Sequence, residues 1–154
     1  MNDPTPLAAL LAQSERQRDL ALADQRKAQG DSDAAAAQVE QLRDYRRDYE
    51  QRWSAQFRKE APIQLVLCYQ GFVTRLSEAI EQQTIAAELA AARLEQAIVA
   101  VRGHDLQLAS VRRLVERRLA ERRGEAERID QKQTDELAAR IASSRLAGAR
   151  TNPA

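Results

Sequence analysis

The chain has 154 residues, of which 29 are alanine and only six are aromatic, so the large side chains that fill a wide globular core are scarce. Its five glycines, four prolines and 31% charged residues exclude a chain of many turns and are typical of long helices. Positive and negative residues are interspersed and the formal net charge is +1, which argues against an overall field that would hold the molecule on nucleic acid or anionic lipid.

The first predicted helix covers about residues 6–58. Thr5 and Pro6 form a good start, because a threonine oxygen can cap free backbone N–H groups and proline is tolerated at the first helical position. Gly30 marks the one place where this helix could break and give a three-helix bundle, although four alanines soon after it restore helix propensity. A seven-residue rhythm with many weak members runs along the segment: Leu7, Leu11, Ser14, Arg18, Ala21, Gln25, Ala28, Ser32, Ala35, Val39, Leu42, Arg46, Tyr49 and Trp53.

A turn is predicted at about residues 59–63, because Pro62 lies there and proline inside a helix costs about 3 kcal/mol. The second helix should cover about residues 64–146, followed by a frayed tail at 147–154. Its seven-residue repeat is steadier than the first: Tyr69, Phe72, Leu76, Ala79, Gln83, Ala87, Ala90, Leu94, Ala97, Val101, His104, Leu108, Val111 and Val115.

A repeat of this persistence predicts a left-handed supercoil with a partner helix, and a short turn makes the first helix the natural partner. We therefore expect an all-α, single-domain chain of two long helices that form an antiparallel coiled-coil hairpin, with the second helix the longer. Fold-back near residue 60 would bring together residues whose numbers add to about 121. The expected pairs near the turn are Tyr49 with Phe72, Tyr45 with Leu76, Leu42 with Ala79, and Gln38 with Gln83.

The sequence lacks the motifs of catalysis and of cofactor binding. It has no glycine-rich phosphate loop and no cluster of Cys or His, and a hairpin offers no concave pocket for a small molecule. The single cysteine, Cys68, fits a small apolar helix position, and the single histidine, His104, falls on the predicted seam. We expect no enzyme activity, no catalytic residue, no metal and no cofactor. The N-terminal residues lack a signal-peptide pattern and no run is apolar enough for a membrane span, which favours a cytoplasmic protein.

The aromatic residues all fall near the predicted turn. A two-stranded seam takes one side chain per layer from each helix, so we expect part of this group to form an exposed patch for a protein partner; the alternative is that the rings only pack the hairpin. The arginines around them could be a solvated face. The six aromatic residues are Tyr45, Tyr49, Trp53, Phe57, Tyr69 and Phe72.

Three segments, in this order and spacing, resemble the FliJ family of flagellar export proteins. They are Leu42-Arg43-Asp44-Tyr45 with Asp48-Tyr49; Tyr69-Gln70-Gly71-Phe72 with Leu76 and Ala79-Ile80-Glu81-Gln82; and Arg128-Ile129-Asp130-Gln131-Lys132 with Asp135-Glu136. The resemblance implies a non-catalytic stalk of type III protein export, shaped like the hairpin of the rotary ATP synthase gamma subunit.

The resemblance also implies the partners. The terminal end would enter the hexamer of the export ATPase FliI, the other end would touch the export gate protein FlhA, and FliH and export chaperones are further candidates. The protein would then sit at the inner face of the cell membrane through the export apparatus and serve flagellar assembly, motility and chemotaxis. The implied gate-facing residues are Gln38, Leu42, Tyr45, Tyr49, Phe72, Leu76, Ala79 and Gln83; the family often has histidine at the position of Gln83.

Three alternatives stay open at this point. One is the equivalent stalk protein of a virulence type III secretion system. A second is a nucleic-acid-binding helical arm, supported by the arginines near the turn and by seven more between Arg112 and Arg128, but weakened by the acidic residues among them. A third is a generic dimeric spacer, for which the aromatic patch would have no use.

Overall fold

The computed structural model describes residues 5–60 and 62–151. Within them lie two α-helices and no strand: α1, Thr5–Phe57, has 53 residues, and α2, Ile63–Arg150, has 88. The predicted fold class, all-α with a longer second helix, is confirmed. α1 passes through Gly30 without interruption, so the three-helix alternative is wrong.

The helix ends differ slightly from the prediction. α1 starts one residue earlier, and α2 extends to Arg150, through the first residues of the expected frayed tail. The rest of that tail, residues 152–154, and the proposed capping side chain of Thr5 lie outside the described residues.

The chain reverses where Pro62 predicts. The Gln56 carbonyl oxygen at the end of α1 accepts hydrogen bonds from the backbone N–H groups of Lys59 (3.1 Å) and Glu60 (3.2 Å). The Pro62 carbonyl oxygen in turn accepts bonds from the N–H groups of Leu65 (3.0 Å) and Val66 (3.2 Å). Pro62 therefore stands just before the helix, where its missing N–H costs nothing and its carbonyl starts the helical ladder.

Contacts along the backbone divide the chain into two units, which we describe separately. The hairpin unit is Gln13–Leu108, and the terminal unit is Met1–Ala12 together with Ala109–Ala154. Whether the chain folds as a single domain stays a prediction. Among the described residues, no helix is long and apolar enough to cross a membrane.

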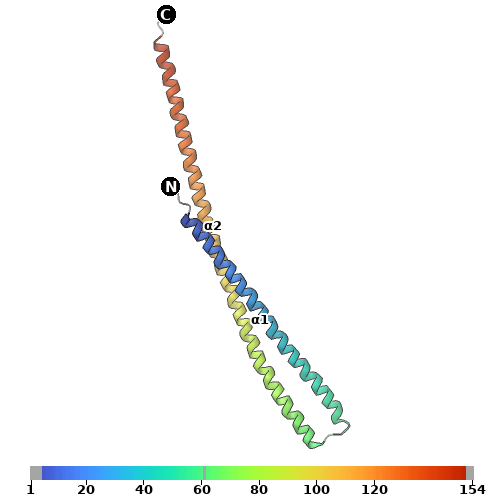
Figure 1. Ribbon diagram of the computed structural model, residues 1–154. Coiled ribbons are helices and arrows are strands. Elements are labelled where there is room, and N and C mark those ends of the chain that lie inside the picture. The colour runs from blue at the N-terminus through green and yellow to red at the C-terminus, as the bar shows by residue number, and fades with distance from the viewer. Residues whose placement is uncertain (1–4, 61, 152–154) are drawn as a thin grey trace. The chain divides into compact units, whose positions relative to one another are not determined.

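In the hairpin unit, the two helices run antiparallel from the turn (Figure 1). Every position of the predicted seven-residue repeats between residues 14 and 108 is buried or half-buried. The buried residues in this unit are Ser14, Ala21, Val39, Leu76, Ile80, Ala90, Val101 and Leu108. Ile80 is the one buried residue of this set that does not belong to the predicted repeat. The repeat named its neighbour Ala79, which is half-buried. In a coiled coil, neighbouring positions on one helix can both contact the opposite helix, and the larger side chain is then buried more.

The pairing of the helices follows the predicted register. The ring centroids of Tyr49 and Phe72, an expected pair, lie 4.5 Å apart. Arg46 Nη1 donates a hydrogen bond of 3.5 Å to Ser77 Oγ, across the same stretch. Far from the turn, a shallow depression has residues of both helices on its walls, in agreement with that register: Gln17, Leu20, Ala21 and Asp24 from α1, and Arg93, Gln96, Ala97, Ala100 and His104 from α2.

Within the terminal unit, the first residues of α1 and the part of α2 after Ala109 contribute the apolar side chains. Leu7, Leu11 and Val115 are half-buried and Val111 is buried. From residue 125 to residue 151, every residue of the chain is exposed. This last stretch of α2 is therefore a helix with no packed face in the described part of the chain.

Candidate protein-interaction surface

The eight predicted partner-binding residues all belong to the hairpin unit, four on each helix, but they differ in exposure. Gln38 and Tyr45 are exposed, the latter to 53%, and Leu76 is buried at 8%. The other five are half-buried: Leu42, Tyr49, Phe72, Ala79 and Gln83. More of Gln38 and Tyr45 than of the five half-buried residues is therefore accessible to a partner, whereas Leu76 mainly contributes to packing within the hairpin.

The six aromatic rings form one continuous cluster near the turn, which we call the aromatic cluster. Tyr49 is its centre: its ring centroid lies 4.5 Å from Phe72, 5.6 Å from Tyr69, 6.0 Å from Trp53 and 6.3 Å from Tyr45. These separations fall in the range of attractive ring pairs, each contributing about 0.5–1.5 kcal/mol beyond its buried area.

The cluster continues toward the turn through Phe57. Its centroid lies 5.2 Å from Tyr69 and 5.5 Å from Trp53. The partner-binding prediction omitted Phe57, Trp53 and Tyr69, although all three were expected near the turn. Because rings of α1 pack against rings of α2, the cluster holds the two helices together at this end of the hairpin.

Tyr45 stands at the margin of the cluster. Its ring lies 6.3 Å from Tyr49 and 6.4 Å from Phe72, the longest separations in the group, and 53% of the residue is exposed. It falls outside the seven-residue seam that includes Leu42 and Tyr49, as its position in the sequence predicted. An exposed aromatic ring with a fixed neighbour can bury more area on a partner at little cost in side-chain entropy.

The environment of the cluster also affects Tyr69. Burial raises the pKa of its phenol above the usual 10.0, and the nearby negative charge of Glu50 and the Tyr49 phenol raise it further. Tyr69 therefore stays a neutral hydrogen-bond donor and apolar surface at physiological pH.

Most of the arginines beside the cluster on α1 have acidic neighbours one helical turn away. Arg43 pairs with Glu40 at 3.0 Å, Arg47 pairs with Asp44, and Arg46 Nε lies 3.9 Å from Glu50. Exposed pairs of this kind contribute little stability, but they neutralise positive charge. The paired carboxylates argue against a phosphate-binding face and so against the nucleic-acid alternative.

Two exposed apolar residues extend the surface beyond the predicted set. Ile63 is 77% exposed and Leu67 is 62% exposed, one turn apart at the start of α2. Cys68, next to them, is a free, exposed thiol. The signal was present in the sequence: the run from Ile63 to Cys68 holds more apolar side chains than one seam can bury.

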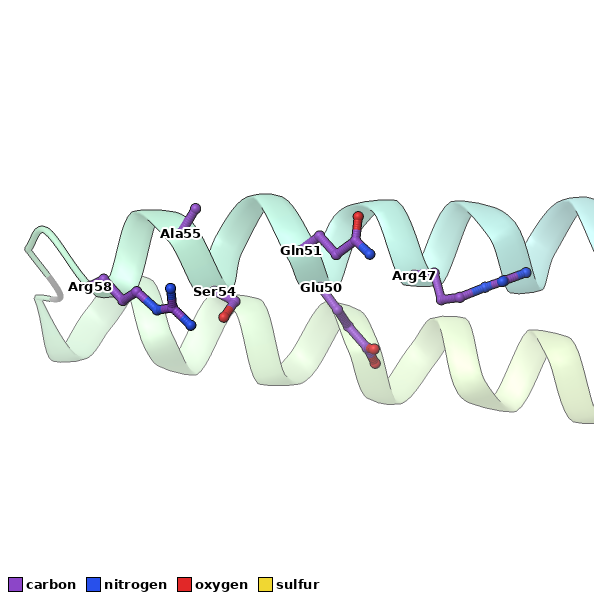
Figure 2. A pocket seen from close by; sticks show the side chains of 6 residues that line it. All are labelled: Arg47, Glu50, Gln51, Ser54, Ala55 and Arg58. Carbon is purple, nitrogen blue, oxygen red and sulfur yellow. The ribbon is translucent and has the colours of Figure 1, made fainter.

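A surface depression beside this region shows no catalytic arrangement. It lies along α1 alone, between Arg47 and Arg58, so it is open rather than enclosed (Figure 2). The lining residues are Arg47, Glu50, Gln51, Ser54, Ala55 and Arg58, none of which is in the predicted set. Among residues 5–60 and 62–151, no group of three His, Cys, Asp or Glu is placed to hold a metal ion. Near the turn, the aromatic cluster instead offers contact through aromatic and apolar surface.

Comparison with known families adds one finding. A family model described as "Flagellar FliJ protein" matches residues 3–147, which is nearly the whole chain. None of the curated proteins or solved structures compared with the chain matches it.

Proposed function

The chain belongs to the flagellar FliJ protein family, which makes it a component associated with flagellar export, and we propose that it is the non-enzymatic stalk that links the export ATPase to the export gate. The observation that carries the proposal is the aromatic cluster at the turn of the hairpin, with Tyr45 exposed at its margin. A helical hairpin without a protein partner would have no use for an exposed aromatic ring at this position.

The turn end of the hairpin unit would bind the gate protein, FlhA. The contact surface would consist of Gln38, Tyr45 and the accessible edges of Leu42, Tyr49 and Phe72. Rings held by neighbours are pre-organised, so binding loses little conformational entropy.

The terminal unit would bind the export ATPase, FliI. Its apolar side chains and its long exposed helix are surfaces that a ring of subunits can cover. FliH and export chaperones would be further partners, and the protein would work in the cytoplasm, held peripherally at the inner face of the membrane by the export apparatus.

Replacement of Tyr45 by alanine tests the gate contact. We expect Tyr45→Ala to weaken binding to the purified cytoplasmic part of FlhA about fivefold or more, because loss of an aromatic anchor typically costs more than about 1 kcal/mol. The melting temperature should fall by only a few degrees, because 53% of the residue is exposed and its two ring pairs are the longest in the cluster. Binding would be measured by titration calorimetry and folding by circular dichroism.

Leu20→Ala is the matched control, because Leu20 is 67% exposed on the same helix, far along the chain from the cluster. It should leave gate binding unchanged, and both variants should keep binding to FliI. If Tyr45→Ala instead melts early and binds FlhA normally once folded, the ring serves only the hairpin and the gate surface lies on another face.

A further inference from the structure

The terminal unit contains an apolar groove with a positively charged rim. The groove lies between the first turns of α1 and the part of α2 from residue 115 to residue 122, and its volume is about 150 Å³. Its lining residues are Leu7, Ala8, Leu11, Val115, Arg118, Leu119 and Arg122.

The apolar part of the groove is unfilled in the described part of the chain. Leu119 is 51% exposed, and Leu7, Leu11 and Val115 are only half-buried. A water molecule has about 30 Å³ of liquid volume, so the groove has room for on the order of five waters or for one large aliphatic or aromatic side chain. Exchange of those waters for such a side chain is favourable, because it removes apolar surface from water on both partners.

The rim carries two guanidinium groups on the same side. Arg118 and Arg122 are one helical turn apart and both are exposed. Within residues 5–60 and 62–151, neither forms a salt bridge or a side-chain hydrogen bond, in contrast to Arg43 and Arg47 of the hairpin unit. Their charge is therefore available to carboxylates of a partner, with which arginine forms short, charge-assisted hydrogen bonds.

We propose that this groove docks an acidic segment of the export ATPase in which Asp or Glu residues flank one large apolar side chain. The apolar side chain enters the groove, and the carboxylates pair with Arg118 and Arg122. This inference rests on the proposed function and specifies the contact made by the terminal unit.

The charges also decide against other occupants. A second copy bound face to face through the same groove would place Arg118 and Arg122 against their own counterparts, which is repulsive. The phosphates of a nucleic acid could pair with the arginines, but a nucleic acid would supply no aliphatic side chain to fill the apolar floor of the groove.

Charge reversal at the rim is the direct test. The full-length double variant Arg118→Glu/Arg122→Glu should bind the purified FliI ATPase at least tenfold more weakly than the wild type. The matched control is Arg117→Glu/Arg123→Glu, which changes the net charge equally on the same helix, at exposed positions outside the groove. The control should lose less than threefold, since its charges contribute only long-range attraction.

The apolar floor has its own pair of variants. Leu119→Ser should weaken FliI binding several-fold, whereas Leu137→Ser, at a residue that is 58% exposed and outside the groove, should not. A photoreactive benzophenone side chain at position 119 should cross-link to a FliI peptide that contains Asp or Glu within one helical turn of a large apolar residue.

The possible failures are distinguishable. If wild-type protein does not bind FliI, the proposed function fails and the inference falls with it. If it binds but both charge reversals weaken binding equally, or neither does, the groove is not the contact and the proposed function stands. A cross-link to a basic or wholly polar segment, or to a second copy of the chain, would also overturn the inference.

Discussion

The hairpin unit and the terminal unit are built from similar residues, yet their helices are stabilised differently. In the hairpin unit, every seam position is buried or half-buried, and Leu108 is only 2% exposed. Beyond residue 125, α2 has the same Ala, Leu, Arg and Glu character, but Ile129, Leu137 and Leu146 are 57–67% exposed. Composition thus favours a helix in both places, while packing supports it in only one.

The largest expected effect is the difference in stability loss between replacing a buried leucine and replacing an exposed leucine of the hairpin unit. Leu108→Ala should lower the free energy of unfolding by about 2–4 kcal/mol, because it removes buried methyl groups and leaves a cavity. Leu106→Ala should change it by less than about 0.5 kcal/mol, since that side chain is 71% exposed. Urea denaturation followed by circular dichroism at 222 nm gives both values. Equal losses at the two positions would mean that the seam does not determine stability.

Hydrogen exchange compares the two units directly. Amides of residues 129–150 should exchange at least about 100-fold faster than amides of residues 76–108, because a helix without a packed face opens locally at little cost. Exchange would be measured by mass spectrometry at several protein concentrations. Slow exchange at 129–150 that does not vary with concentration would reveal a stabilising contact for the last part of α2.

A smaller effect comes from glycines inside α2. A Cβ added at Gly103 would meet no heavy atom within 4 Å, and one at Gly124 would meet only the end of the Arg128 side chain at 3.9 Å. Gly103→Ala should raise the free energy of unfolding of the hairpin unit by about 0.5–1 kcal/mol, through helix propensity alone. Gly124→Ala should raise helical ellipticity but leave the urea midpoint of the hairpin unit unchanged. A rise in that midpoint with Gly124→Ala would show that the two units unfold together.

Much of the fold was predictable because each element depends on a local rule. Pro62 fixes the reversal, and with it the register that brings Tyr49 against Phe72. The continuity of α1 through Gly30 does not follow from such a rule, because the cost of one glycine in a helix is comparable to what neighbouring residues can offset.

The candidate surfaces were predictable only in part, because exposure depends on how side chains share a layer. The resemblance named Leu76 as a contact residue, but the structure buries it at 8%, as it buries Ile80 one turn later at 7%. Exposed Tyr45 could be inferred from its place outside the repeat. The groove beside Leu119 could not, since it requires a leucine one turn past the last seam residue, Val115, and its volume depends on side-chain positions.

The free thiol of Cys68 gives this chain a built-in reporter. The chain has one cysteine, and it is exposed next to Tyr69 of the aromatic cluster. A maleimide dye would therefore attach at one defined position per molecule, with no engineered mutation. Because tyrosine and tryptophan quench many fluorophores on contact, the brightness of the dye should change when a partner covers the cluster. The unmodified sequence can thus report, one molecule at a time, whether the turn end of the hairpin is occupied.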